Sequence, residues 1–401
     1  MTKHTNFSNF QVGIYERGVH GEKPSLPMRI EDLEELAKSK LSREAYGYIA
    51  GAAGSESSVR FNREAFDQWR IVPRMLRDVA KRDLSLTLFN TRMPVPVVLA
   101  PVGVQSIAHP EGELAVARAA SELNVPFTYS LAATQSPEDV AAAAGDGPRW
   151  FQIYWPKDRE ITQSFLRRAE AAGYSAIVVT LDTRMLGWRE RDLELAYLPF
   201  LKGEGIGAYL SDPVFRDRLE QPPEEDMETA VHNWAIGFSD LSHTWEDLEF
   251  LKQSTSLPVI LKGILHPDDA ILAIEHGVDG IVVSNHGGRQ VDACIAALDA
   301  LPPVVDAVAG RIPILFDSGI RRGADVFRAL ALGAEAVLVG RPYIWGLAVA
   351  GADGVKEVIN RLMADFDITM ALCGCRSLQE VDRNTVVRHG SLQGKEFECA
   401  N

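Results

Sequence analysis

The chain has 401 residues, a length that fits one large domain or two ordinary ones. Its composition is 46% hydrophobic and 24% charged, which is typical of a globular protein with a large core and excludes a disordered or fibrous chain. The excess of 55 acidic over 41 basic residues gives a net charge of −14, so the average field repels nucleic acid but leaves room for a local basic pocket.

Cysteine usage and apolar runs bear on the cellular compartment. The four cysteines are too few for a disulfide scaffold, and Cys373 and Cys375 lack the second pair that a zinc site of this type needs. The first residues form no apolar run of signal-peptide length, and the chain holds no run of about 18 apolar residues. We therefore expect a cytoplasmic protein without a membrane segment or a bound metal.

Short apolar runs rich in Val and Ile alternate with helical segments from about residue 94 onward. Continuous hydrophobicity is typical of strands buried on both faces of a parallel sheet. The predicted strands are 95–100, 126–130, 149–154, 176–182, 258–263, 280–285, 313–319 and 336–340. The predicted helices, which carry apolar residues at three- and four-residue spacing, include 111–124, 158–173, 266–277 and 323–333. The pattern predicts a closed (β/α)₈ TIM barrel, with an open doubly wound sheet as the alternative.

Two segments exceed a minimal barrel. Residues 1–93 precede the first strand, include a helical stretch over 41–54, and are expected to cap one barrel end. The connection 183–256 after the fourth strand is far longer than an ordinary crossover, so we expect a lid over the site, with a floppy insertion as the alternative. The barrel domain is predicted over 94–380 and a C-terminal tail over 381–401.

Polar residues follow the carboxyl ends of the predicted strands, where barrel active sites lie. They are Gln152, Tyr154, Thr180, Asp182, Arg189, Lys262, Ser284, Asn285, His286, Arg289, Asp317, Gly319, Gly340 and Arg341. Glycine backbone and arginine side chains after the last two strands predict a phosphate-bearing ligand. Lys262 ends an apolar run, so it is expected to meet an anion or a polarised ring, or to form a structural salt bridge with Asp182 or Asp317.

His286 and Arg289 lie three residues apart and suit a small acid. The imidazole titrates near neutrality and can remove a proton, while the planar guanidinium fits a carboxylate. Asp182 is expected to hold the second ring nitrogen and to stabilise the cationic ring. No histidine or carboxylate pair accompanies His286 at metal-ligand spacing, which disfavours a metal site.

These residues lie in motifs that resemble those of the FMN-dependent α-hydroxy acid oxidases, the family of glycolate oxidase, lactate oxidase and mandelate dehydrogenase. The resemblance covers nearly the whole chain. The matching blocks are YGYIAGAAGSE (46–56), APVGV (100–104), AHPEGE (108–113), FQIYWPKDR (151–159), TLDT (180–183), LKG (261–263), SNHGGRQ (284–290), FDSGIRRGADV (316–326) and GRP (340–342).

The resemblance implies that His286 is the active-site base and that Asp182 supports it. The residues implied to contact the substrate carboxylate and hydroxyl are Tyr48, Tyr154, Arg189 and Arg289. Lys262 matches a lysine beside the flavin, where a cation stabilises the reduced ring. The other implied FMN contacts are Pro101, Val102, Gly103, Ser130, Gln152, Thr180, Ser284, Asp317, Gly319, Arg321, Gly340 and Arg341.

Within this family, the pattern is closest to lactate 2-monooxygenase. Gly103 stands where ordinary oxidases usually carry Ala, and the long connection contains GWRERDL (187–193), LPFL (198–201), SDPVF (211–215) and HTWED (243–247). This resemblance implies that lactate and O₂ give acetate, CO₂ and water, with slow release of the keto acid under the lid.

Four positions depart from the family pattern. Ala132 and Leu186 stand where pocket residues of the family are often larger, and Arg184 and Met185 also differ from the monooxygenase. The pocket is therefore expected to admit a 2-hydroxy acid bulkier than lactate.

The sequence thus predicts an FMN enzyme that oxidises a small L-2-hydroxy acid with O₂, with lactate 2-monooxygenase as the preferred activity. One alternative is an oxidase that releases a 2-keto acid and H₂O₂, on lactate or a larger acid. Another is a catalytically silent flavin-binding barrel. Proton abstraction and hydride transfer from C2 both remain open. Family analogy predicts a homotetramer or homo-octamer, and no nucleic-acid or membrane partner is expected.

Overall fold

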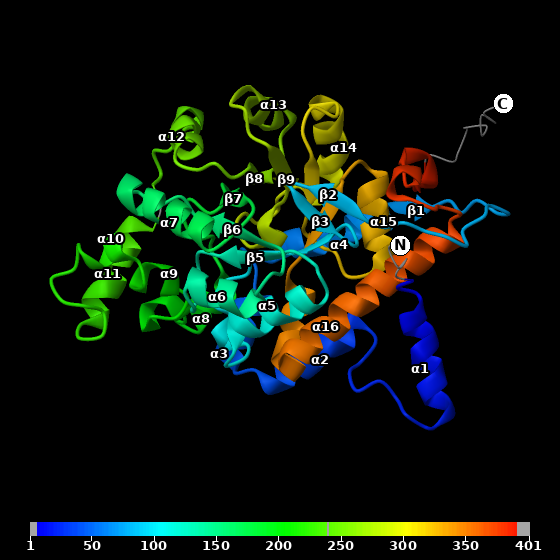
Figure 1. Ribbon diagram of the computed structural model, residues 1–401, viewed down its shortest axis with the longest axis horizontal. Helices are drawn as coiled ribbons and strands as arrows, with labels where there is room; N and C mark the ends of the chain where they lie inside the picture. Colours follow the sequence, from blue (N-terminus) through cyan, green and yellow to red (C-terminus); the bar gives the residue numbers. More distant parts are fainter. Residues whose placement is uncertain (1–5, 239, 391–401) are drawn as a thin grey trace.

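The computed structural model describes residues 6–238 and 240–390. At its centre, eight parallel strands close into a barrel in chain order, from β4 to β11, which then pairs with β4 (Figure 1). The strands are β4 (Val97–Leu99), β5 (Phe127–Ser130), β6 (Arg149–Ile153), β7 (Ile177–Thr180), β8 (Val259–Ile264), β9 (Gly280–Val283), β10 (Ile314–Phe316) and β11 (Ala336–Val339). Each overlaps a predicted strand, which confirms the TIM barrel and excludes the doubly wound sheet.

Barrel strands are buried on both faces, which explains their continuous hydrophobicity. In β7, Val178 belongs to the cluster that fills the barrel, while Ile177 and Val179 pack in the outer cluster beneath the helices. The interior cluster also includes the hairpin of β2 (Leu86–Leu88) and β3 (Thr91–Met93). Phe89 of this hairpin meets Trp150 of β6 edge-on at 5.6 Å between ring centroids, so the hairpin plugs the barrel away from the site.

The four predicted helices are present. They are α5 (Gly112–Glu122), α7 (Arg159–Ala171), α13 (Pro267–Glu275) and α15 (Gly323–Ala331). Further helices were not singled out from the sequence: α6 (Pro137–Ala144), α14 (Ala297–Val308) and α16 (Arg341–Leu372). Pro302 and Pro303 lie inside α14, and the backbone breaks at Gly351 within α16, so local signals for helix ends do not mark the true ends of these helices.

The segment before the barrel contributes to both barrel ends. It forms α1 (Asn9–Val19), α2 (Ile30–Lys40), α3 (Arg43–Ala50), α4 (Ser57–Asp67), β1 (Trp69–Ile71) and the β2–β3 hairpin. The helix predicted over 41–54 ends earlier, at Ala50, because the chain after it turns to bind two site loops. Ala53 N donates to Gly288 O at 3.0 Å, and Gly54 N donates to Trp188 O at 2.7 Å.

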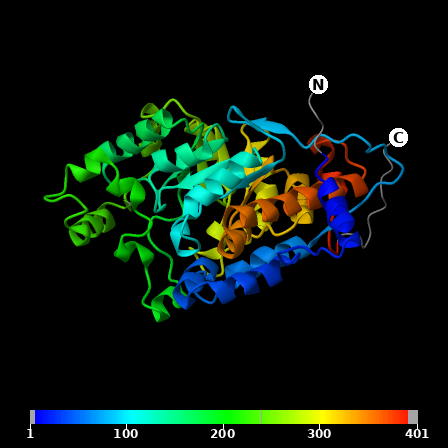
Figure 2. The same ribbon diagram turned by 60° about the horizontal axis from the view of Figure 1, so that its bottom comes forward.

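The described residues of the long connection between β7 and β8 form a series of short helices. It contains α8 (Glu190–Glu194), η2 (Pro199–Lys202), α9 (Gly207–Leu210), α10 (Pro213–Arg216), α11 (Met227–Gly237), η3 (Trp245–Asp247) and α12 (Leu248–Gln253). Buried aromatic residues, among them Phe200, Tyr209 and Trp234, give it a core that is continuous with the barrel's outer layer. In Figures 1 and 2 this green segment lies on the side of the barrel opposite to the blue helix α1.

The end of the chain returns to the N-terminal segment. Strand β12 (Val386–Arg388) pairs antiparallel with β1. Residues 391–401 of the predicted tail, including Cys399, lie outside the described residues. In the part of the chain that the structure describes, no helix is long and apolar enough to span a bilayer, and no three His, Cys, Asp or Glu side chains gather as metal ligands.

Candidate active site

A cavity lies at the carboxyl ends of the barrel strands and gathers most of the predicted site residues. Its lining includes Tyr48, Pro101, Val102, Gly103, Tyr154, Arg189, Lys262, His286, Arg289, Asp317, Gly319, Arg321, Gly340 and Arg341. Of the residues predicted to act in catalysis or to bind substrate or FMN, five do not line this cavity: Ser130, Gln152, Thr180, Asp182 and Ser284. These five form hydrogen bonds beneath it or beside it.

The buried polar residues under the cavity are linked across adjacent strands. Gln152 accepts a hydrogen bond from Ser130 Oγ at 3.1 Å and donates to Thr180 Oγ1 at 2.9 Å. Ser284 Oγ accepts a hydrogen bond from Lys262 Nζ at 2.9 Å. Parallel strands bring these strand-end side chains into one row, as the sequence pattern predicted.

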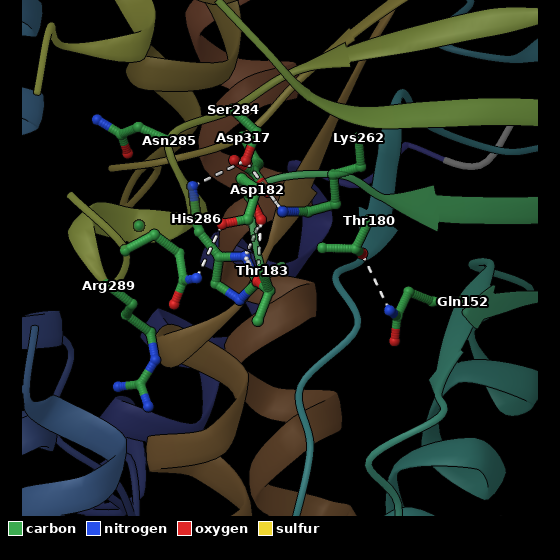
Figure 3. A network of polar contacts seen from close by, with 12 residues as sticks. Gln152, Thr180, Asp182, Thr183, Lys262, Ser284, Asn285, His286, Arg289 and Asp317 are labelled. Atoms are coloured by element: carbon green, nitrogen blue, oxygen red, sulfur yellow. Dashed lines mark hydrogen bonds and ion pairs between the residues drawn. The ribbon is translucent and has the colours of Figure 1, made fainter. Parts of the chain in front are cut away.

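His286 and Asp182 form the central pair of the site (Figure 3). His286 Nδ1 lies 2.7 Å from Asp182 Oδ1, and Thr183 Oγ1 donates to the same oxygen at 3.1 Å. With the Nδ1 proton directed at the carboxylate, the Nε2 atom is the ring position free to accept a proton. His286 has a left-handed backbone with φ of 56°, and its N–H donates to Ser284 Oγ at 3.0 Å.

The pair is tuned to keep the carboxylate charged and the imidazole neutral. Burial opposes the charge of Asp182, but His286 and Lys262 outweigh it and lower the pKa of the carboxyl to about 2. Burial also lowers the pKa of His286 below its usual 6.5, an effect that Asp182 only partly offsets. At neutral pH the imidazole is therefore a base with its proton-accepting position empty.

Lys262 forms the structural salt bridge that the sequence left open. Its ammonium lies 3.2 Å from Asp317 Oδ2, at the end of β10, and it is buried, with 4% of its side chain exposed. Burial works against the charge, but Asp317 and Asp182 together raise the pKa of the lysine. Because Lys262 also lines the cavity, pairing with Asp317 and facing a ligand are compatible roles.

Three partly buried arginines line the same cavity. Arg289 donates to the carbonyls of Tyr48 and Gly51 at 2.7 and 2.6 Å, and Arg341 donates to Gly51 O and Gly287 O, both at 2.9 Å. Burial and then Arg189 lower the pKa of Arg289 to about 10, while burial and then Arg289 lower that of Arg341 to about 9.

Arg321 is the third member of this set, and burial lowers its pKa too. Among the described residues, Arg289, Arg321 and Arg341 form no ion pair with a carboxylate. Their side-chain hydrogen bonds go to backbone carbonyls, and the Arg289 guanidinium also lies 5.1 Å from the centroid of the Tyr48 ring. Removing a cation from water without a counter-charge is costly, so an anion in the cavity would stabilise these arginines. This surplus fits a flavin phosphate and a substrate carboxylate.

Arg189 is fixed by a residue that sequence reasoning missed. Gln290 Oε1 accepts a hydrogen bond from Arg189 Nη2 at 2.7 Å, and Gln290 Nε2 donates to the carbonyls of Asp182 and Met185 at 2.8 and 3.0 Å. The side chain of Arg189 is only 6% exposed. Gln290 closes the SNHGGRQ motif, and its position beside His286 and Arg289 was the signal available in the sequence.

Five aromatic residues form an arc of ring contacts, and four of them, all except Trp234, line the cavity. Tyr48 meets Phe200 at 6.3 Å between ring centroids, Phe200 meets Trp234 at 5.1 Å, Trp234 meets Phe238 at 5.2 Å, and Phe238 meets Tyr154 at 5.2 Å. Sequence analysis singled out only the two tyrosines. Phe200 and Phe238 come from the connection after β7 and line the cavity directly. Aromatic residues within the predicted lid were the available signal.

The packing around residue 103 favours glycine for a reason that the sequence did not show. A Cβ atom at this position would lie 2.7 Å from Ala132 Cβ and 2.9 Å from Ala132 O, closer than side chains pack. The two loops are also joined by a hydrogen bond from Val104 N to Ala132 O at 2.8 Å. Close approach of the loops therefore favours glycine here, whatever its effect on a bound ligand.

Comparison with known proteins places this site in a family. The FMN-dependent dehydrogenase family model matches residues 37–388. An FMN-dependent alpha-hydroxy acid dehydrogenase from Penicillium citrinum is 47% identical over 387 residues, covering 96% of each chain. An L-lactate oxidase from Lysinibacillus sphaericus is 46% identical over 92% of this chain and 95% of the relative. A crystal structure of mandelate oxidase matches with a TM-score of 0.79 and 40% identity, covering 89% of this chain and 97% of that one. The chain therefore belongs to the FMN-dependent α-hydroxy acid dehydrogenase and oxidase family, and its cofactor is FMN.

Proposed function

We propose that this chain oxidises an L-2-hydroxy acid at C2 and transfers the electrons to O₂. The observation that carries the proposal is the meeting of His286, backed by Asp182 at 2.7 Å, with Arg189 and Arg289 at one buried cavity. A neutral base beside two guanidinium groups suits a substrate with a carboxylate next to an oxidisable carbon.

Each residue has a defined task in this proposal. Arg289 and Arg189 hold the substrate carboxylate, and His286 Nε2 accepts one proton while Asp182 stabilises the imidazolium that forms. Tyr154 lies near the substrate hydroxyl. This assignment is the same whether C2 loses a proton or a hydride.

FMN, when bound, supplies the two-electron acceptor for C2 oxidation. Lys262 would face the ring, where its ammonium stabilises negative charge. Arg321 and Arg341 would hold the phosphate, because their guanidinium groups have no carboxylate partner among the described residues. Further FMN contacts are proposed for Pro101, Val102, Gly103, Ser130, Gln152, Thr180, Ser284, Asp317, Gly319 and Gly340.

We propose lactate 2-monooxygenase as the specific activity, in which lactate and O₂ give acetate, CO₂ and water. Gly103 and the sequence motifs of the long connection support this outcome. Phe200 and Phe238, which the long connection contributes to the lining of the cavity, are a physical means of delaying release of the keto acid.

A second candidate is an oxidase for a larger 2-hydroxy acid. Ala132 and Leu186 line the cavity with small or partly exposed side chains, and the aromatic arc offers apolar surface to a longer substrate. Such an enzyme would release the 2-keto acid and H₂O₂. The L-lactate oxidase relative from Lysinibacillus sphaericus, at 46% identity, supports an oxidase.

One experiment separates these candidates. The FMN-loaded protein is mixed anaerobically with L-lactate, L-2-hydroxyoctanoate or L-3-phenyllactate, then exposed to air, and the products are identified. Bleaching by lactate followed by acetate supports the monooxygenase, whereas stoichiometric keto acid and peroxide contradict it. Faster bleaching by the larger acids supports the second candidate, and no bleaching by any acid supports a silent barrel.

Cytoplasmic location and a homotetramer or homo-octamer remain predictions.

A further inference from the structure

Two loops beside the cavity are held together by an inserted segment. One loop follows β4 and carries Gly103, and the other follows β5 and carries Ala132. Residues 203–207 of the long connection lie against both loops. Gly207 N donates to Ala133 O at 2.9 Å, and a Cβ at Gly205 would lie 2.6 Å from Val104 Cγ2 and 2.9 Å from Ala132 O. The insertion therefore contacts the site loops at backbone distance.

Glu204 anchors this contact from the insertion side. Its Oε2 atom accepts hydrogen bonds from Ser106 Oγ at 2.5 Å and from Thr134 Oγ1 at 3.4 Å. Ser106 Oγ and Thr134 Oγ1 are themselves 2.8 Å apart, and Gly205 N donates to Thr134 Oγ1 at 3.1 Å. One carboxylate thus joins the insertion to a residue of each loop.

Glu113 of α5 anchors the same loops from beneath. Its Oε1 atom accepts hydrogen bonds from the backbone N–H of Gln105 at 3.0 Å and of Thr134 at 3.3 Å. The side chain is fully buried, and Oε2 has no hydrogen-bond partner in the described part of the chain. The first loop is therefore held at Gln105 and Ser106, and the second at Thr134, by two carboxylates, one from α5 and one from the insertion.

We propose that Glu113 and Glu204 form a carboxylate clasp that fixes the two site loops and docks the insertion on them. Phe200, three residues before the 203–207 segment, is thereby kept against the cavity, where it delays escape of the keto acid. Glu204 and Glu113 are positioning residues in this account, since neither lines the cavity. The role in product retention rests on the proposed function, whereas the docking role does not.

The test compares Glu204→Ala, Glu204→Gln and the control Glu224→Ala in the FMN-loaded protein. Glu224 lies in the same insertion but is exposed, and among the described residues its ion pair is with Arg216 of that insertion. Amide hydrogen exchange of residues 203–210 reports docking, and the dissociation rate of added pyruvate reports retention. Glu204→Gln keeps an oxygen that can accept both hydroxyl hydrogen bonds. Its amide exchange and its pyruvate dissociation rate should therefore stay close to those of the parent.

We expect Glu204→Ala to raise both exchange and pyruvate dissociation about tenfold, as expected for loss of a charged hydrogen-bond acceptor, while anaerobic bleaching changes less than about threefold. Unchanged exchange would overturn the clasp. Increased exchange with unchanged pyruvate dissociation would overturn the retention role. Because exchange needs no turnover, the clasp is tested even if no 2-hydroxy acid bleaches the parent protein, a result that would refute only the proposed function.

Discussion

Adding one methyl group at Gly103 should destabilise the protein, by an amount that follows from the loop contact. The new Cβ of Gly103→Ala would lie 2.7 Å from Ala132 Cβ and 2.9 Å from Ala132 O, so the loops must separate by several tenths of an ångström. Overpacking of this kind costs about 1–3 kcal/mol. In the double variant Gly103→Ala/Ala132→Gly, the facing methyl group is absent. This removes the contact with Ala132 Cβ and leaves the contact with the carbonyl oxygen of residue 132.

The assay is urea unfolding of the two single variants, the double variant and the parent, combined with product analysis. We expect Gly103→Ala to lose about 1–3 kcal/mol of unfolding free energy and the double variant to recover about half of that loss. Ala132→Gly alone is the matched control for the lost methyl. A fully stable Gly103→Ala, or a double variant no better than the sum of its singles, would refute the packing account.

The same variants separate two effects on products. If the methyl itself favours peroxide over acetate, the double variant should resemble Gly103→Ala. If loop separation is the cause, the product ratio of the double variant should lie between those of Gly103→Ala and the parent, because the contact with Ala132 O remains. An unchanged product ratio in both would remove the reason for linking Gly103 to the monooxygenase outcome.

Three further predictions concern the base and its partners. Asp182→Asn should slow anaerobic bleaching by about 10²-fold or more while FMN stays bound, and a rate within threefold of the parent would contradict its role. Since His286 works when neutral and burial lowers its pKa, activity should fall with decreasing pH only below 6.5, and an acid limb of kcat/KM above that value would contradict this. Gln290→Met should free Arg189 and raise KM about tenfold with kcat within about threefold; an unchanged KM in steady-state assays would show that Gln290 does not position it.

Much of the fold could be predicted because barrel strands are buried on both faces. Runs such as 176–182 and 280–285 are then continuously apolar, and their last residues carry the chemistry. The helix with Pro302 and Pro303 could not be predicted in this way, because tertiary packing overrides the local signal of two prolines. The early end of the helix predicted over 41–54 also depends on a tertiary contact, the hydrogen bond from Ala53 to Gly288.

Candidate site residues could be predicted where they stand at a strand end, but not where they act through a distant contact. The structure places His286, Lys262 and Asp317 at strand ends and around one cavity, as the sequence pattern predicted. Gln290 acts on a residue 101 positions away, and Glu113 holds two separate loops from a helix face. Neither of these contacts produces a repeating pattern in the sequence, so they become visible only in the folded structure.

The central claim is that His286 is the base for oxidation of a 2-hydroxy acid at C2. Its most direct test is the anaerobic bleaching rate of the FMN-loaded parent and of His286→Gln with the same 2-hydroxy acid. The account predicts that both proteins bind FMN, that the parent bleaches, and that the variant is slower by about 10²–10⁴-fold. Bleaching of His286→Gln at the parental rate, or no bleaching of the parent by any 2-hydroxy acid, would contradict it.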